Sequence, residues 1–175
     1  HPYEGAVAVD PAKASPAARG YSPYARRKYP TRPLFGDTHH HTSNSGDAFM
    51  AGNRLTPEEA YRFARGEEVV SSTGVPAKLS RPLDFLVIYD HAEGLGLMFQ
   101  VYEGNPAFMQ DPILIGWNKA MKEGGKAAAD AANDVTSRQA QGTLPAPVKD
   151  PKVVGPIMKS VWQQHTATAE KYNDP

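Results

Sequence analysis

The sequence predicts an α/β fold in which two short parallel strands are connected through a helix. Residues 34–39 are a short strand candidate, residues 84–89 are an almost continuously apolar one, and the helix start Thr56-Pro57-Glu58-Glu59 lies between them. Strand, helix and strand in this order are typical of parallel pairing. Histidine and aspartate end both runs, so we expect them at the carboxyl ends of the strands, where parallel sheets carry functional groups.

The helix start is the clearest local signal. Thr56 is expected to cap the helix, Pro57 to occupy its first position, and Glu59 to complete a capping box. A polar loop is expected before it, through Gly52. The second strand, residues 84–89, is almost continuously apolar, which predicts burial on both of its faces.

Beyond residue 96 the pattern is mainly helical. Asp111-Pro112 is expected to begin a helix that Gly124-Gly125 breaks, and the alanine-rich residues 127–132 favour another. A proline-rich linker precedes a final helix, residues 156–172. His165 lies on the apolar face of that helix, where packing is its expected role.

Composition and charge exclude several classes of protein. The 175 residues, 40% hydrophobic and 22% charged, suffice for one domain with a core but not for a complete barrel. Nineteen basic and nineteen acidic side chains cancel, so neither nucleic acid nor an anionic membrane is an expected partner. No apolar run approaches the roughly 20 residues of a membrane span. A first residue His1 rather than Met favours a periplasmic or secreted protein after signal removal over a cytoplasmic one.

The histidine-rich segment after the first strand predicts a metal site. Side chains two apart on a strand point to the same side, so His39 and His41 can face one ion while His40 faces away. Asp47 can fold back from the loop, and His91 ends the second strand. Nitrogen and carboxylate donors without sulfur suit Zn, Mn or Fe. The alternative is a histidine-rich surface loop that binds no metal.

These segments resemble a known superfamily. The pattern His39-x-His41-Thr42-x-x-Ser45-x-Asp47-Ala48, followed by Asp90-His91, is similar to the first two motifs of the PHP (polymerase and histidinol phosphatase) superfamily. Longer agreement with one poorly characterised PHP-like branch runs densely over residues 30–96. It includes Phe35-Gly36-Asp37-Thr38-His39, Gly52-Asn53-Arg54-Leu55, Arg81-Pro82-Leu83-Asp84-Phe85 and Asp90-His91-Ala92-Glu93.

The resemblance implies the N-terminal part of a distorted (β/α)7 PHP-type barrel, a relative of the TIM barrel, with a helical insertion. Residues 1–32 would be an extended arm, residues 33–96 the first two βα units, and residues 97–175 a helical insertion or lid. The superfamily's bridging Glu and later His and Asp ligands have no match here. We therefore expect the barrel to continue beyond the chain end, so that the remainder of the barrel is a partner and this fragment alone is incomplete.

The implied activity is that of a metal-dependent hydrolase, a phosphoesterase that cleaves phosphate mono- or diesters by metal-activated water. The resemblance implies a polynuclear centre of two or three divalent ions (manganese, zinc or iron), with His39 and His41 on one ion and Asp47 and His91 on a neighbouring one. Tyr89 replaces the usual Thr before Asp-His, and His40 occupies a commonly apolar position.

Five further residues are candidates for a part in the reaction. Asp90, or alternatively Asp37, is expected to accept the second N–H of a ligating imidazole. Glu93 is expected either to touch the substrate or to cap the following turn. Arg54 and Arg81 are candidates for a substrate phosphate. For Arg54 the alternative is a salt bridge with Glu58 or Glu59, and for Arg81 it is a loop-anchoring role.

Two other functions stay open. The same metal site could hydrolyse other esters, lactones or amides, since activated water attacks many electrophiles. Alternatively, the chain could be a non-catalytic metal-binding interaction module.

Overall fold

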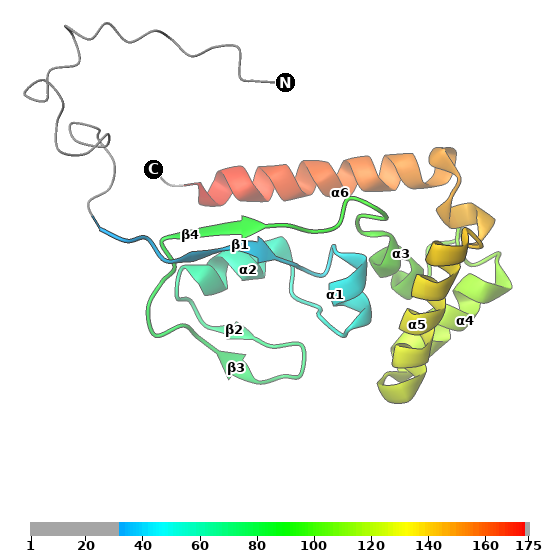
Figure 1. The fold of residues 1–175 in the computed structure, drawn as a ribbon, viewed down its shortest axis with the longest axis horizontal. Coiled ribbons are helices and arrows are strands. Elements are labelled where there is room, and N and C mark those ends of the chain that lie inside the picture. The colour runs from blue at the N-terminus through cyan, green and yellow to red at the C-terminus, as the bar shows by residue number, and fades with distance from the viewer. Residues whose placement is uncertain (1–31, 174–175) are drawn as a thin grey trace, which may run out of the picture. The chain divides into compact units, whose positions relative to one another are not determined.

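A parallel pair of strands joins the two histidine-bearing segments of the chain. β1 (Gly36–His40) pairs with β4 (Phe85–Ile88), with Gly36 opposite Phe85 and His40 opposite Ile88. The structure is a computed structural model that describes residues 32–173, so the predicted arm, apart from Arg32, lies outside the described residues. The parallel pairing expected from the sequence is confirmed, and the described chain is a mixed α/β structure (Figure 1).

The second strand is buried on one face only. Ile88 is buried and Leu86 half-buried, whereas Phe85 and Val87 remain 41% and 44% exposed. Alternate strand residues point to opposite faces of the sheet, and α2 (Pro57–Ala64) packs against β4. The prediction of burial on both faces is therefore wrong for the described part of the chain.

Helix α2 begins as its sequence predicts. The Thr56 hydroxyl accepts a hydrogen bond from the Glu59 N–H, and the Glu59 carboxylate accepts one from the Thr56 N–H at 2.8 Å. These reciprocal bonds satisfy two backbone donors that a helix start otherwise leaves free. Ala60 and Ala64 are buried on the inner face of the helix.

Two short features were not anticipated. The predicted polar loop contains a five-residue helix, α1 (Gly46–Met50), and the region after α2 forms a small antiparallel hairpin from β2 (Val69–Val70) and β3 (Pro76–Ala77). Phe49 of α1 is fully buried, so this short helix is fixed by tertiary packing.

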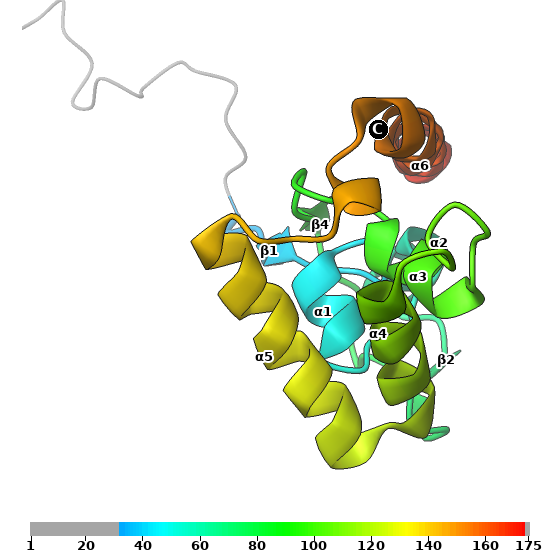
Figure 2. The same ribbon diagram turned by 90° about the vertical axis from the view of Figure 1, so that its right-hand side faces the viewer.

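The remaining elements are helical. They are α3 (Leu97–Glu103), α4 (Pro112–Glu123), α5 (Gly125–Gln141), the 3₁₀ helix η3 (Ala146–Val148) and α6 (Pro151–Tyr172). Helices α3 and α4 pack together, as do α4 and α5, and α1 contacts both α3 and α5 (Figure 2). The main core lies among these helices and comprises Phe49, Leu97, Val101, Phe108, Leu114, Trp117, Met121 and Ala131.

Helix α6 starts earlier than the sequence suggests. Asp150 caps it by accepting the Lys152 N–H, and Pro156 lies inside the helix rather than at its start. The face that includes His165 is half-buried as expected, and α6 packs on α2 and α3. Its last turn is tied to α2 because Glu58 accepts hydrogen bonds from Lys171 at 2.6 Å and Tyr172 at 2.5 Å.

Among the described residues, none of the helices combines the length and the apolar character needed to cross a membrane.

Candidate metal centre

The candidate site lies where β1 and β4 end. His41 follows β1 directly, His91 follows β4 after two residues, and Asp47 lies in the first turn of α1. Parallel pairing brings both strand ends to the same edge of the sheet. The loop between β1 and α1 then turns back, since the Ser45 N–H donates to the Thr42 carbonyl at 3.0 Å.

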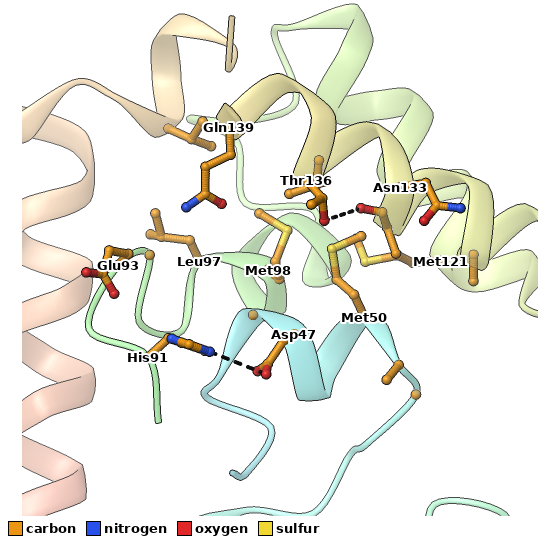
Figure 3. A pocket seen from close by; sticks show the side chains of 18 of the residues that line it. Asp47, Met50, His91, Glu93, Leu97, Met98, Met121, Asn133, Thr136 and Gln139 are labelled. Carbon is orange, nitrogen blue, oxygen red and sulfur yellow. Dashed lines mark hydrogen bonds and ion pairs between the residues drawn. The ribbon is translucent and has the colours of Figure 1, made fainter. Parts of the chain in front are cut away.

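Three of the four predicted metal ligands converge. His41 Nδ1 lies 3.0 Å from Asp47 Oδ2, and His91 Nε2 lies 3.4 Å from the same oxygen. The ligand atoms of these three residues all lie within 4.8 Å of one another. The two imidazole rings meet edge to face, with centroids 4.9 Å apart. Figure 3 shows His91 directed at Asp47.

Ser45 organises this cluster, a role that sequence reasoning did not assign. Its hydroxyl donates to Asp47 Oδ1 at 2.6 Å, lies 3.2 Å from His41 Nδ1, and accepts the His91 N–H at 3.2 Å. Ser45 is fully buried. One small hydroxyl therefore touches all three residues of the cluster, and it fixes them relative to one another.

The electrostatics of the cluster keep Asp47 negatively charged. Partial burial raises the pKa of Asp47, but hydrogen bonds from Ser45, His41 and the Ala48 N–H outweigh it and lower the pKa far below its usual value. Half of the Asp47 side chain remains exposed. An ionised oxygen ligand is therefore present at any ordinary pH.

The donor set fits a divalent cation. It consists of two imidazoles and one carboxylate, the ligand types of Zn, Mn and Fe sites. In addition, His41 Nε2 is buried and has no hydrogen-bond partner within residues 32–173. Buried ring nitrogens are normally paired, so a missing partner at this position is consistent with a ligand to the ring.

His39 lies next to the cluster without completing it. Its ring stacks on His41 with centroids 4.9 Å apart and planes inclined by 11°, so the two side chains share one side of the strand as expected. The Tyr89 ring also contacts the His39 ring, with centroids 4.9 Å apart. His40 faces Asp37 at 3.9 Å instead. The ligand role of His39 stays a prediction.

Asp90 occupies a different position from the one expected. Its side chain is 1% exposed, and its two oxygens accept hydrogen bonds from the Thr42 N–H at 2.5 Å and the Thr42 hydroxyl at 2.6 Å. The imidazole beside it belongs to His165 of α6, at 3.6 Å, and not to a predicted ligand. Asp37 likewise accepts the backbone N–H of His39. Both carboxylates thus hold the backbone around the site.

His165 was expected to pack against apolar residues. Its ring is largely buried beside Asp90, and its Nδ1 has no hydrogen-bond partner among residues 32–173. Asp90 follows β4 and His165 lies on α6, far apart in the sequence. No local residue spacing could therefore predict this pair.

The two arginines differ in position. Arg54 lines the cavity next to the cluster, but its guanidinium donates to the Phe49 and Asn53 carbonyls and stacks on the Phe49 ring at 3.9 Å. Arg81 pairs with Asp84 at 3.2 Å, beside the amino end of β4, whereas the cluster lies at the carboxyl ends. The position of Arg81 therefore favours the loop-anchoring alternative over a substrate contact.

A cavity of about 910 Å³ opens beside the cluster. Asp47, His91 and Glu93 line one end of it, and side chains from α1, α3, α4, α5 and α6 line the rest (Figure 3). Glu93 thus lies at the same end of the cavity as the cluster. Pockets of this size hold small organic molecules in many proteins.

The fold and the cluster define a mixed α/β protein with a candidate metal site at the carboxyl edge of parallel strands. The chain belongs to the family described as "Protein of unknown function (DUF3604)", whose sequence profile matches residues 28–175. No curated protein matches the chain significantly. No solved structure does so either.

Proposed function

We propose that this chain supplies the first ligands of a divalent metal centre in a hydrolase that cleaves phosphate esters. The observation that carries the proposal is the convergence of His41, Asp47 and His91, whose ligand atoms lie within 4.8 Å of one another. The carboxyl edge of parallel strands is a typical location for an active site, and nitrogen and oxygen donors gathered there suit a metal-dependent reaction.

The resemblance to the PHP superfamily supports the finer parts of the proposal. The matching motifs fall on β1, on α1 and at the end of β4, and they contain the three clustered residues. On this basis we propose that β1 and β4 are neighbouring strands of a PHP-type barrel and that His39 completes the ligand set. The helical residues 97–173 would then border the mouth of the barrel.

Each residue of the site has a distinct part in this proposal. His41, Asp47 and His91 would hold the cation, which would supply a Lewis acid and lower the pKa of bound water towards neutrality. Ser45 keeps the three ligands in register through its contacts to all of them. Asp90 fixes the turn at Thr42 that follows His41. Glu93 lines the adjoining cavity near the cluster and would contact a bound ester there.

Metal titration of the full chain tests the proposal. Calorimetry with Zn²⁺ and Mn²⁺ should show saturable binding, which Asp47→Ala and His91→Ala should weaken by more than the roughly 10- to 100-fold that loss of an outer contact costs. The matched control is His40→Ala, since His40 adjoins His41 in sequence but faces Asp37. Equal binding by wild type and Asp47→Ala, or the same loss in His40→Ala, would overturn the proposal.

A further inference from the structure

The cavity beside the cluster has a strongly apolar body. Four of the chain's five methionines line it, namely Met50, Met98, Met121 and Met158, and Leu97 joins them. They come from α1, α3, α4 and α6, so the apolar wall is assembled from segments distant in sequence. Methionine side chains are flexible and polarisable, and they adapt to apolar ligands of varied shape.

Small residues on α5 create the space. Ala128, Ala129 and Ala132 line the cavity, and residues four apart, such as Ala128 and Ala132, share one helix face. The position of α5 is fixed independently, because Trp117 of α4 donates to Asp134 of α5 at 2.9 Å and Ala131 is buried in the core. Helix α5 is thus anchored by neighbouring residues while its alanine face leaves the cavity open.

Asp47, His91 and Glu93 line the end of the cavity next to the cluster. The α5 wall adds the polar side chains of Asn133, Thr136 and Gln139, of which Thr136 already donates to the Ala132 carbonyl at 3.0 Å (Figure 3). A polyhydroxylated ligand such as a sugar would leave many hydroxyl groups against the methionines without partners, at a cost for each one. The arrangement instead matches a molecule with one polar end and one bulky apolar end.

We propose that this cavity binds the apolar alcohol portion of the substrate, so that the ester is amphiphilic and carries an aromatic or branched aliphatic group. The assignment of the ligand as an ester rests on the proposed function. The apolar binding site itself rests on the cavity alone. Hydrolysis would then leave a hydrophobic alcohol in the methionine-lined body, and the polar group at the cluster.

Binding of the alcohol product without metal tests the site directly. The full chain in chelator is titrated with 1-naphthol, followed by its fluorescence, and with glycerol, followed by calorimetry. We expect saturable binding of 1-naphthol and at least about tenfold weaker binding of glycerol, since glycerol has almost no apolar surface to bury. Equal affinity for the two alcohols would overturn the inference, and this comparison needs no variant.

A filled cavity supplies the second comparison. Ala132→Phe should weaken 1-naphthol binding about tenfold, the loss expected when roughly 50 to 60 Å² of apolar contact is removed. Ala140→Phe is the matched control, because Ala140 is an exposed alanine of the same helix outside the cavity lining. Circular dichroism verifies that both variants fold. The same loss in both variants would contradict the assignment.

Asp47→Ala separates this inference from the proposed function. It should weaken metal binding as stated above yet leave 1-naphthol binding within about threefold of wild type, because burial of the apolar group dominates the affinity. Naphthol binding without any metal binding in the wild type would refute the hydrolase and keep the apolar site. Metal binding without naphthol binding would refute the apolar site and leave the proposed hydrolase standing.

Discussion

Removal of the Asp90 carboxylate should destabilise the folded chain strongly. Thr42 is fully buried, and both its N–H and its hydroxyl donate to Asp90. Asp90→Ala leaves these two donors buried without an acceptor. Each unsatisfied buried donor costs about 1–3 kcal/mol, so the free energy of unfolding should fall by about 2–6 kcal/mol.

Asp90→Asn refines the prediction. Asparagine keeps one carbonyl oxygen for the Thr42 N–H, and its amide can donate to the Thr42 hydroxyl, which accepts as well as donates. The geometry is retained but both bonds lose a charged acceptor. The free energy of unfolding should therefore fall by about 1–3 kcal/mol, less than in Asp90→Ala.

Urea unfolding of the full chain, followed by circular dichroism, measures both decreases. Asp130→Ala is the control, because Asp130 is an exposed aspartate whose ion pair within residues 32–173 is with Lys126, one turn away on α5. It should change the stability by no more than about 0.5 kcal/mol. An Asp90→Ala variant as stable as this control would refute the reasoning, as would an Asp90→Asn variant less stable than Asp90→Ala.

Two further predictions concern the strand pair and the end of α6. Gly36→Ala should destabilise the chain by about 1–3 kcal/mol, because a Cβ there would lie 2.2 Å from the Phe85 carbonyl oxygen. Gly116→Ala, which has open space around it in α4, should instead stabilise the chain by up to about 1 kcal/mol. Equal urea midpoints of the two variants would contradict this prediction. Hydrogen bonds from Lys171 and then Tyr172 lower the pKa of Glu58 below its ordinary 4.5, so its contribution is present above pH 4.5 and is lost as the pH falls through the lowered value. Glu58→Gln should consequently be less stable than wild type at pH 7 and equal to it in strong acid, whereas a stability difference that is the same at both pH values would disprove the coupling.

Elements encoded by adjacent residues could be predicted from the sequence. The capping box of Thr56 and Glu59 operates within one helical turn, and Asp111 caps α4 through the next N–H groups. Helix α1 could not be predicted in this way, because the Ser45 side chain does not cap it and bonds to Asp47 instead. Its position depends on the burial of Phe49 against distant helices.

The start of α6 shows why proline misled the prediction. Pro156 suits a first helical position, but Asp150 and Pro151 supply the same signals five residues earlier. Packing of the later turns on α2 and α3 holds the helix through Pro156. Local preference therefore marked a valid start that the tertiary contacts overrode.

The features of the candidate site likewise divide into those set by local residue spacing and those set by contacts between distant segments. The two-residue spacing of His39 and His41 predicted their shared side, and the strand ends predicted that His91 would meet His41. The roles of Ser45, Asp90 and His165 depend on contacts between segments that no spacing relates. The sequence likewise shows that Arg54 carries a charge but does not show what its guanidinium contacts. In the structure the guanidinium stacks on the Phe49 ring.

The central claim, that His41 and His91 together bind a divalent cation, is tested most directly by nuclear magnetic resonance of the full chain with ¹⁵N-labelled histidine rings. Titration with Zn²⁺ should shift the ring nitrogens of His41 and His91 together, saturating as one binding event, while His40 and His165 stay unchanged. Ring signals of His41 and His91 that do not move, or that move only after those of His1 or His40, would contradict the metal centre.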